Sequence, residues 1–279
     1  MESVKPNYSA LMSVYYKENP VYLKQSIKSM LSQTIKPSDF VIVADGPLTP
    51  ELDQVLNHFT KNHPGLFQII RLKNNCGLGL ALKEGIKHCK NELIARMDSD
   101  DSCAKNRIEK QLEILKQHKE YDLIGTNVNE FTDETSNVIS YVKLPETPKE
   151  IAKFAKKRCP FRHPSLLYKK STIEKAGSYR NFHLYEDYDL YIRLLRNGAK
   201  CYNIQEPLTY MRVNPDFYKR RGGISYLKDT LRFKNYQKKS GYYNLKDYLK
   251  TTAPHIIVCL MPNFLRKKVY QKLLRKKVS

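Results

Sequence analysis

The 279-residue chain contains no tryptophan, and its six cysteines stand far apart without a Cys-x-x-Cys pair among them. This spacing argues against a zinc knuckle and a disulfide framework, and it favours a reducing compartment. Long apolar runs are also missing, because none reaches the roughly 18 residues of a membrane-spanning helix. The N-terminus has no secretory signal pattern. We therefore expect a cytoplasmic protein without a membrane-spanning helix.

Positive charge is plentiful but unevenly placed. From residue 218 onward the chain has 17 Lys or Arg and 2 Asp, so this tail carries +15 of the total formal charge of +21. Within it, 255–278 interleaves apolar residues with Lys and Arg, as helices on anionic membranes do. The alternatives are a solvated basic surface, packing of the apolar side on the body, or binding of nucleic acid.

Apolar runs of strand length alternate with amphipathic helical patterns along the chain. Strands are expected at 8–14, 40–44, 67–72, 93–97, 122–128, 138–143, 165–168, 201–204 and 208–213, and helices near 20–31, 50–59, 78–89, 108–119, 146–157 and 185–197. This alternation predicts an α/β fold with a doubly wound, mostly parallel sheet flanked by helices. We expect a body over 1–215 and a basic helical region over 216–279. That region would contain a mobile loop near 218–223 and a membrane-surface helix at 255–278.

The strand expected at 93–97 runs directly into Asp98, Asp100 and Asp101. Ligands of open α/β sheets bind beyond the carboxyl ends of the strands. Clustered carboxylates repel one another unless a cation holds them, and Mg²⁺ or Mn²⁺ shares such ligands with substrate phosphates. A helix cap is the alternative for any one of these residues. The whole cluster predicts a site for a metal ion and a diphosphate.

A second acidic cluster, Glu186-Asp187-Tyr188-Asp189, opens the helix expected at 185–197. The helix dipole favours acids in a first turn, so one or two of them have a structural alternative. A carboxylate that faces a cleft there is able to deprotonate a hydroxyl. One acidic site for a metal and another for a base suit transfer from a phosphate-activated donor to an alcohol.

Three shorter motifs are less specific. Asp45, before Gly46, is placed to accept hydrogen bonds from a base or a ribose, with a plain turn as the alternative. Asn75 and Gly77 lie in a loop whose glycines allow a ligand close to the backbone, although the spacing is neither a Walker loop nor a Rossmann fingerprint. His163 is more often structural in such a loop, but it would suit a donor sugar or a metal.

These motifs occur together in one order: Asp45-Gly46, Asn75-x-Gly77-Leu78-Gly79, Met97-Asp98-Ser99-Asp100-Asp101, His163-Pro164-Ser165, Gly177-x-Tyr179 and Glu186-Asp187-Tyr188-Asp189-Leu190. The set resembles the family-2 glycosyltransferases with a GT-A fold. It is most similar to the bacterial members that build capsule, exopolysaccharide and lipopolysaccharide O-antigen. The resemblance covers essentially the whole chain.

The resemblance implies a role for each matching residue. Asp45 would hold the base, Asp98 the ribose, Asp98 and Asp100 the metal ion, and Asp187 would be the general base of an inverting transfer. The remaining residues expected to contact the nucleotide sugar are Val14, Tyr15, Tyr16, Glu18, Asn75, Gly77, Arg96, Ser99, His163, Glu186 and Arg221. Arg221 would close over the diphosphate, because guanidinium groups donate in pairs to phosphate oxygens. A solvent-facing basic loop is the alternative for Arg221.

The resemblance also implies partners: a nucleotide-diphosphate sugar, with UDP as the default, a glycan or undecaprenyl-diphosphate-linked acceptor, and the inner face of an anionic membrane. No Gln-x-x-Arg-Trp signature of processive synthases is present, so we expect addition of a single sugar. Asn214 stands where relatives often have a histidine ligand. A nucleotidyltransferase would need a Gly-rich basic loop near 13–20, which is missing. Binding of nucleic acid leaves both acidic clusters unexplained and is not expected.

Overall fold

The computed structural model of the protein describes residues 7–213 and 221–274. These residues are organised around one mixed sheet with the strand order β3-β2-β1-β4-β8-β6-β9-β5, and β7 pairs with β6. The strands are β1 (Tyr8–Val14), β2 (Asp39–Ala44), β3 (Phe67–Arg71), β4 (Leu93–Arg96), β5 (Ser102–Cys103), β6 (Leu123–Phe131), β7 (Val138–Val142), β8 (Leu167–Lys169) and β9 (Cys201–Arg212). The pairs within β1 to β4 are parallel. Strand β8 pairs antiparallel with β4, β7 with β6, and β5 with β9. The predicted α/β class is confirmed.

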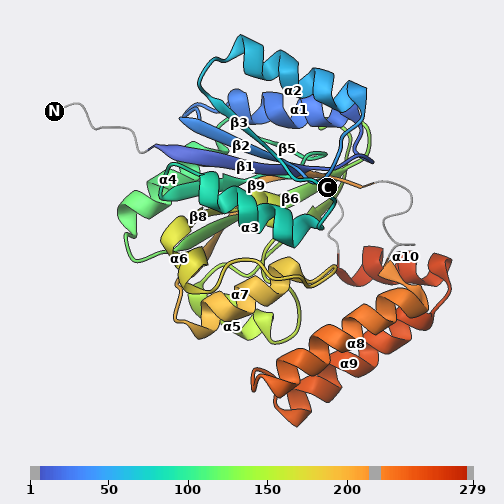
Figure 1. Ribbon diagram of the computed structural model, residues 1–279. Helices are drawn as coiled ribbons and strands as arrows, with labels where there is room; N and C mark the ends of the chain where they lie inside the picture. The colour runs from blue at the N-terminus through green and yellow to red at the C-terminus, as the bar shows by residue number, and fades with distance from the viewer. Residues whose placement is uncertain (1–6, 214–220, 275–279) are drawn as a thin grey trace.

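Helices cover both faces of this sheet (Figure 1). One face packs against α1 (Pro20–Leu31), α2 (Pro50–Asn62) and α4 (Arg107–Gln117), and the other against α3 (Leu78–His88), α5 (Pro148–Ala155), α6 (Lys170–Lys175) and α7 (Glu186–Arg196). Because side chains alternate along a strand, Ala10 and Met12 of β1 join the first core, and Leu11 joins the second.

Local sequence explains where several of these helices begin. Asn19, Thr49 and Thr147 each accept a backbone N–H bond from the first turn, and a proline follows each of them. Side-chain oxygens at this position satisfy a free helix donor, and proline at the next position loses nothing by lacking an N–H. These three caps fix the entry points of α1, α2 and α5.

The last three helices, α8 (Gly223–Lys239), α9 (Leu245–Leu260) and α10 (Asn263–Leu274), follow the sheet. Helices α8 and α9 lie side by side as a hairpin below the body (Figure 1). An aromatic cluster joins this hairpin to α7, with the ring of Tyr185 stacked on Phe233 at 4.5 Å between centroids. Helices α8 and α9 are therefore packed on the body by a core of their own.

No helix within the described ranges is long and apolar enough to span a bilayer.

Some local expectations need correction. The strands expected at 201–204 and 208–213 form the single strand β9, whose register shifts where Pro207 faces Asn127. Proline cannot donate to the ladder, so the sequence looks interrupted where the strand continues. The single helix expected at 255–278 is wrong, because α9 ends at Leu260 and α10 begins at Asn263.

The sequence analysis does not predict β5 or α6, which are both very short. Three expected features fall partly or wholly outside the described residues: Asn214, the segment 218–220 of the expected mobile loop, and the end of the tail beyond residue 274.

Candidate active site

Parallel pairing brings the ends of three strands to one edge of the sheet. The last residues of β1 and β2 pair with each other, and Leu11 pairs with Arg96 at the end of β4. The segment 14–18, Asp45 and Asp98 follow these strand ends, so they lie along the same edge. This is the edge at which open α/β sheets bind ligands.

Arg96 supports the first acidic cluster from inside the protein. Its side chain is 1% exposed and forms an ion pair with Asp98, whose side chain is 29% exposed. The hydroxyl of Ser26 donates to the Asp98 carbonyl oxygen at 2.6 Å. The sequence predicts contact between Arg96 and the donor, but the structure buries Arg96 behind Asp98. Its contacts are those of a residue that positions this carboxylate.

Glu18 and Ser99 connect the segment after β1 to the acidic cluster. The hydroxyl of Ser99 donates to one oxygen of Glu18 at 2.5 Å, and the backbone N–H of Asn19 donates to the other at 2.8 Å. Ser99 is buried, while Tyr15 and Tyr16 are 41% and 50% exposed. The structure therefore gathers these predicted residues, with the two tyrosines at the outer rim.

The other two acids of this cluster are held in different ways. Burial, followed by the charges of Asp98 and Glu18, raises the pKa of Asp100 to about 7. Asp101 is buried and accepts the backbone N–H of Arg212 at 2.7 Å, while burial and the charge of Asp100 raise its pKa well above the usual range. The guanidinium of Arg212 donates to the Asp100 carbonyl oxygen at 3.0 Å. Sequence reasoning misses Arg212, because no acidic motif lies near it in the chain.

Asp45 organises the glycine loop that precedes α3. Its carboxylate oxygens accept the backbone N–H groups of Cys76 at 2.7 Å and Gly77 at 3.0 Å, and the amide of Asn75 donates to its carbonyl oxygen at 3.1 Å. Gly46 has a φ of +88°, and a Cβ there would lie 2.8 Å from the Asn75 nitrogen. Only glycine fits this contact. Asp45, Asn75 and Gly77 therefore form one unit, a contact that the sequence analysis does not predict.

The glycine loop leads to the second acidic cluster. A Cβ at Gly79 would lie 2.8 Å from the Arg180 carbonyl oxygen and 2.9 Å from the Glu186 Cβ, so glycine lets the start of α3 approach the start of α7. Glu186 and Asp187 occupy the first turn of α7. Burial, with the charge of Asp187 next, raises the pKa of Glu186 to about 8.

Asp187 combines burial with a small set of partners. One of its oxygens accepts the backbone N–H of Tyr188 at 2.6 Å, and the other lies 3.8 Å from the Cys159 sulfur, which donates to it. Burial raises the pKa of Asp187, and the charges of Arg96 and Arg162 oppose this rise. A carboxylate with a raised pKa is a better proton acceptor than a solvated one.

The two acidic clusters meet at one cavity of about 750 Å³, which both Asp98 and Asp187 line. The sequence predicts that the two clusters face one pocket, and the structure brings Asp98 and Asp187 together in this way. His163 and Arg221 also line the cavity, whereas Asp45 and Asp100 are not in its lining.

His163 lines the cavity with a neutral imidazole. Its Nε2 lies 2.7 Å from the Tyr179 hydroxyl. Burial and the charge of Arg96 lower the pKa of His163 well below the usual range. The imidazole is therefore uncharged at neutral pH and suits a hydrogen bond with a ligand better than charge compensation.

The acidic cluster implies a metal ion, for which Asp98 and Asp100 are the predicted ligands. In 7–213 and 221–274, no three His, Cys, Asp or Glu side chains are grouped to hold an ion. Asp98 and Asp100 are close enough for the charge of one to raise the pKa of the other. Divalent ions in phosphate-transferring sites often use one or two carboxylates and take their remaining ligands from phosphate and water. The residues fit such a site.

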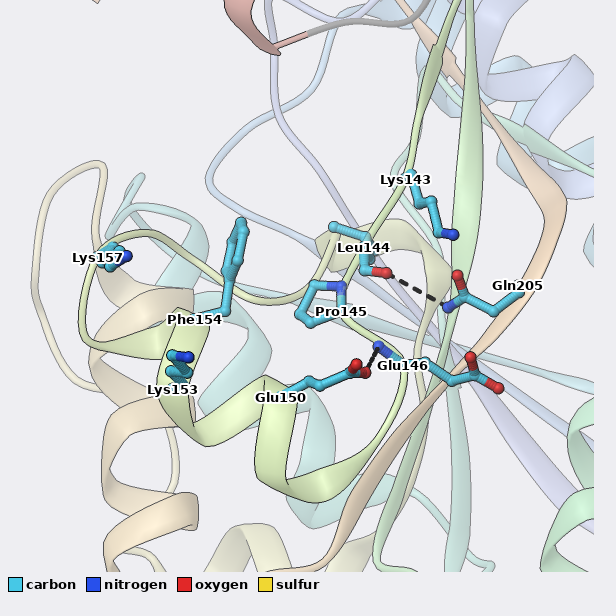
Figure 2. A pocket seen from close by; sticks show the side chains of 9 residues that line it. All are labelled: Lys143, Leu144, Pro145, Glu146, Glu150, Lys153, Phe154, Lys157 and Gln205. Carbon is cyan, nitrogen blue, oxygen red and sulfur yellow. Dashed lines mark hydrogen bonds between the residues drawn. The ribbon is translucent and has the colours of Figure 1, made fainter.

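A second cavity, of about 500 Å³, lies beside α5 (Figure 2). The acids that line this second cavity stabilise local structure. Glu150 accepts hydrogen bonds from the backbone N–H groups of Glu146 and Thr147 at the start of α5, and Glu146 accepts one from the Tyr202 hydroxyl. Neither acidic cluster lines this second cavity. We therefore place the chemistry at the larger one.

Comparison with known proteins identifies the family. Residues 9–175 match the family model of glycosyl transferase family 2. The chain belongs to this family. It is 37% identical over 269 residues to an uncharacterized glycosyltransferase of Haemophilus influenzae, covering 96% of this chain and 99% of the relative. With the family established, the nucleotidyltransferase alternative is dropped.

A second relative carries a more specific name. The chain is 32% identical over 276 residues to a UDP-Gal:alpha-D-GlcNAc-diphosphoundecaprenol beta-1,3-galactosyltransferase of Escherichia coli, with 99% of each protein covered. The fold of the present chain is similar to that of the mannosyltransferase PcManGT of Pyrobaculum calidifontis, solved with GDP-Man and Mn²⁺. That likeness has a TM-score of 0.63 at 12% identity and covers 95% of this chain and 72% of the other. The expected GT-A fold of this glycosyltransferase is thereby confirmed.

Proposed function

We propose that this glycosyltransferase moves one sugar from a UDP-sugar to a hydroxyl of a lipid-linked acceptor, with inversion, in the synthesis of a bacterial surface polysaccharide. The observation that carries the proposal is that Asp98 and Asp187 line one cavity. The name of the Escherichia coli relative supports both a UDP donor and an acceptor on diphosphoundecaprenol. The missing processive signature supports a single addition.

The strand ends would bind the donor. Asp45 and the segment 14–18 take the base, Asp98 takes the ribose, and Arg221 takes the diphosphate. Further contacts come from Asn75, Gly77, Ser99, His163 and Glu186. Asp98 and Asp100 would hold Mn²⁺ or Mg²⁺, which when bound supplies positive charge to the departing nucleoside diphosphate. Arg96 keeps the Asp98 carboxylate in place.

Asp187 would serve as the general base. It accepts the proton of the acceptor hydroxyl while that oxygen forms a bond to C1 of the sugar. The bond from C1 to the diphosphate oxygen breaks on the opposite side, so the anomeric configuration inverts. The raised pKa of Asp187 supports this assignment, because it increases the affinity of the carboxylate for the proton.

The C-terminal helices would hold the protein at the inner face of the cytoplasmic membrane. Exposed apolar side chains occur along α9 and at the start of α10, each between 56% and 63% exposed: Leu245, Leu249, Ile257, Leu260 and Phe264. The tail also carries most of the net positive charge. Apolar side chains among cations bind anionic membrane surfaces.

The test is to incubate the full chain with UDP-, GDP- and dTDP-sugars, Mn²⁺ or Mg²⁺, and a GlcNAc-diphosphate-lipid analogue. Release of nucleoside diphosphate and the anomeric configuration of the product are then measured. We expect acceptor-dependent release from a UDP-sugar, loss of release with EDTA, and an inverted product. A retained configuration, or full activity in EDTA, would contradict the proposed mechanism.

A further inference from the structure

Two chemically different groups of side chains line the large cavity. Asp98 and Asp187 belong to the site described above, and we call them its acidic end. The second group is basic, comes from α8, α9 and the segment after α5, and is called the basic end: Lys157, Arg158, Lys234 and Lys250. Arg162 also lines the cavity, but its charge acts on Asp187. Among the described lining residues, no carboxylate belongs to this second group. Such a concentration of cations suits a multiply charged anion.

Lys234 of α8 is the most informative of these cations. It is 3% exposed, yet it lines the cavity. Within the part of the chain that the structure describes, its ammonium donates one hydrogen bond, to the Thr251 carbonyl oxygen at 2.9 Å, and has no carboxylate partner. An ammonium has three donors, so two are left for a ligand. A buried charge without a counter-charge is costly, and a bound anion would offset that cost.

The positive charges of Lys234 and Arg158 act on the same neighbour, His255. Burial, then the charges of Lys234 and Arg158, lower the pKa of His255 to about 4. Burial lowers the pKa of Lys234 to about 8. The acid on the first turn of α9, Asp247, pairs with Lys156 at 3.7 Å. A ligand that brings negative charge would relieve this repulsion and stabilise the folded protein.

We propose that the basic end of the cavity binds the diphosphate of a lipid-linked acceptor and so directs the acceptor sugar toward Asp187. The inference rests on the proposed function, which requires an acceptor hydroxyl at Asp187. The cavity of about 750 Å³ lies within the usual range for small ligands. Apolar lining residues, among them Phe233, Pro254 and Val258, suit the first part of a prenyl chain. The proposal assigns the donor diphosphate to the acidic end and the acceptor diphosphate to the basic end.

The experiment titrates the full chain with farnesyl diphosphate by calorimetry, without donor or metal. Farnesol and inorganic pyrophosphate are titrated in parallel, and UDP with Mn²⁺ is titrated separately. We expect farnesyl diphosphate to bind at least about tenfold more tightly than either farnesol or pyrophosphate, because the site takes both the anion and the adjoining chain. Pyrophosphate binding as tightly as farnesyl diphosphate would overturn the assignment to a lipid-linked ligand.

Variants locate the binding. Lys234→Met keeps the apolar stem and is expected to weaken farnesyl diphosphate about 30-fold or more. Lys250→Ala, at an exposed rim position, is expected to weaken it about two- to fivefold. Lys246→Ala is the matched control, because Lys246 is exposed one turn earlier on α9 and does not line the cavity. Should Lys234→Met fail to fold, Lys250→Glu beside Lys246→Glu tests the same claim.

The readouts separate this inference from the proposed function. Loss of farnesyl diphosphate binding with unchanged UDP affinity supports an acceptor site. Equal loss of both ligands would assign the cations to the donor and overturn the inference. Unchanged farnesyl diphosphate binding in every variant would also overturn it. A protein that binds farnesyl diphosphate through Lys234 but releases no nucleotide from any donor would refute the proposed function alone.

Discussion

The acidic and basic ends of the large cavity are built on different principles. At the acidic end, strand ends and a helix start supply the acids. Asp98 pairs with the guanidinium of Arg96, and Asp101 and Asp187 each accept a backbone N–H. At the basic end, helices outside the sheet supply Lys234. Among the described residues its ammonium contacts the Thr251 carbonyl oxygen and the ring of Tyr243, at 5.9 Å from the centroid, and no carboxylate. We interpret the acids of the first end as held in position by the protein itself, and the charge of Lys234 at the second end as one that a bound anion would offset.

The contrast between the acidic and basic ends of the cavity is tested most strongly by changing Asp187. We expect Asp187→Asn to lower kcat by about 100- to 10,000-fold, the usual contribution of a general base. Because burial raises the pKa of Asp187, wild-type activity should decline with falling pH well before an ordinary carboxylate would be protonated. Asp229→Asn, on α8 and outside the cavity lining, is the control. Full turnover in Asp187→Asn would remove Asp187 as the base.

The buried ion-pair partner of Asp98 is tested by changing Arg96. Arg96→Met leaves the Asp98 carboxylate without its buried counter-charge and is expected to cost about 3–5 kcal/mol of unfolding free energy. Arg71→Met is the control: Arg71 pairs with Asp53 at 2.8 Å while half exposed, so its loss should cost about 1 kcal/mol or less. Urea denaturation of both variants measures the difference. Equal losses of unfolding free energy in Arg96→Met and Arg71→Met would show that Arg96 does not hold Asp98 in position.

The dependence of stability on pH tests the acidic end as a whole. Burial raises the pKa of Glu186 from its ordinary value of 4.5 to about 8, so between these values the native state keeps a proton that the unfolded state has lost. Its contribution to stability is present below pH 4.5 and is lost as pH rises through 8. Glu186→Gln should flatten this decline and raise the melting temperature at pH 8 by about 2–4 °C.

The control for this pH series is Glu113→Gln, which changes an exposed glutamate on α4. Differential scanning calorimetry between pH 5 and 9 gives the slope for each protein. An unchanged slope in Glu186→Gln would mean that another group causes the decline.

The smallest expected effect concerns the membrane. Replacing Leu260 and Phe264 by serine should weaken binding to phosphatidylglycerol vesicles about tenfold, because both side chains are more than half exposed beside the basic tail. Ile139→Ser is the control, since Ile139 is exposed on β7 in the body. Vesicle co-sedimentation provides the measurement. Binding that persists in the double variant would place membrane contact elsewhere.

The acidic end could be predicted from the sequence because local patterns encode it. An apolar strand that ends in carboxylates, and acids that open a helix, are visible without coordinates. Arg96 shows the limit, because adjacency to Asp98 in the chain does not reveal which of the two is buried. The interruption by Pro207 likewise hides the continuity of β9.

The basic end could not be predicted in this way. Lys234 lies in a tail so rich in lysine that no pattern marks it as the buried one. Its position depends on how α8 packs through Phe233 against Tyr185, a contact between distant parts of the chain. Composition predicts a basic surface there, and only the packing turns part of that surface into a cavity wall.

The central claim is that Asp98 serves the donor while Asp187 serves the acceptor hydroxyl. Calorimetric titration of Asp98→Asn and Asp187→Asn with the UDP-sugar and Mn²⁺ tests it most directly. We predict that Asp98→Asn weakens donor binding about tenfold or more, because it removes a charged contact to the metal-bound donor. Asp187→Asn should keep wild-type donor affinity and lose only transfer. Equal loss of donor affinity in both variants would contradict this division of roles.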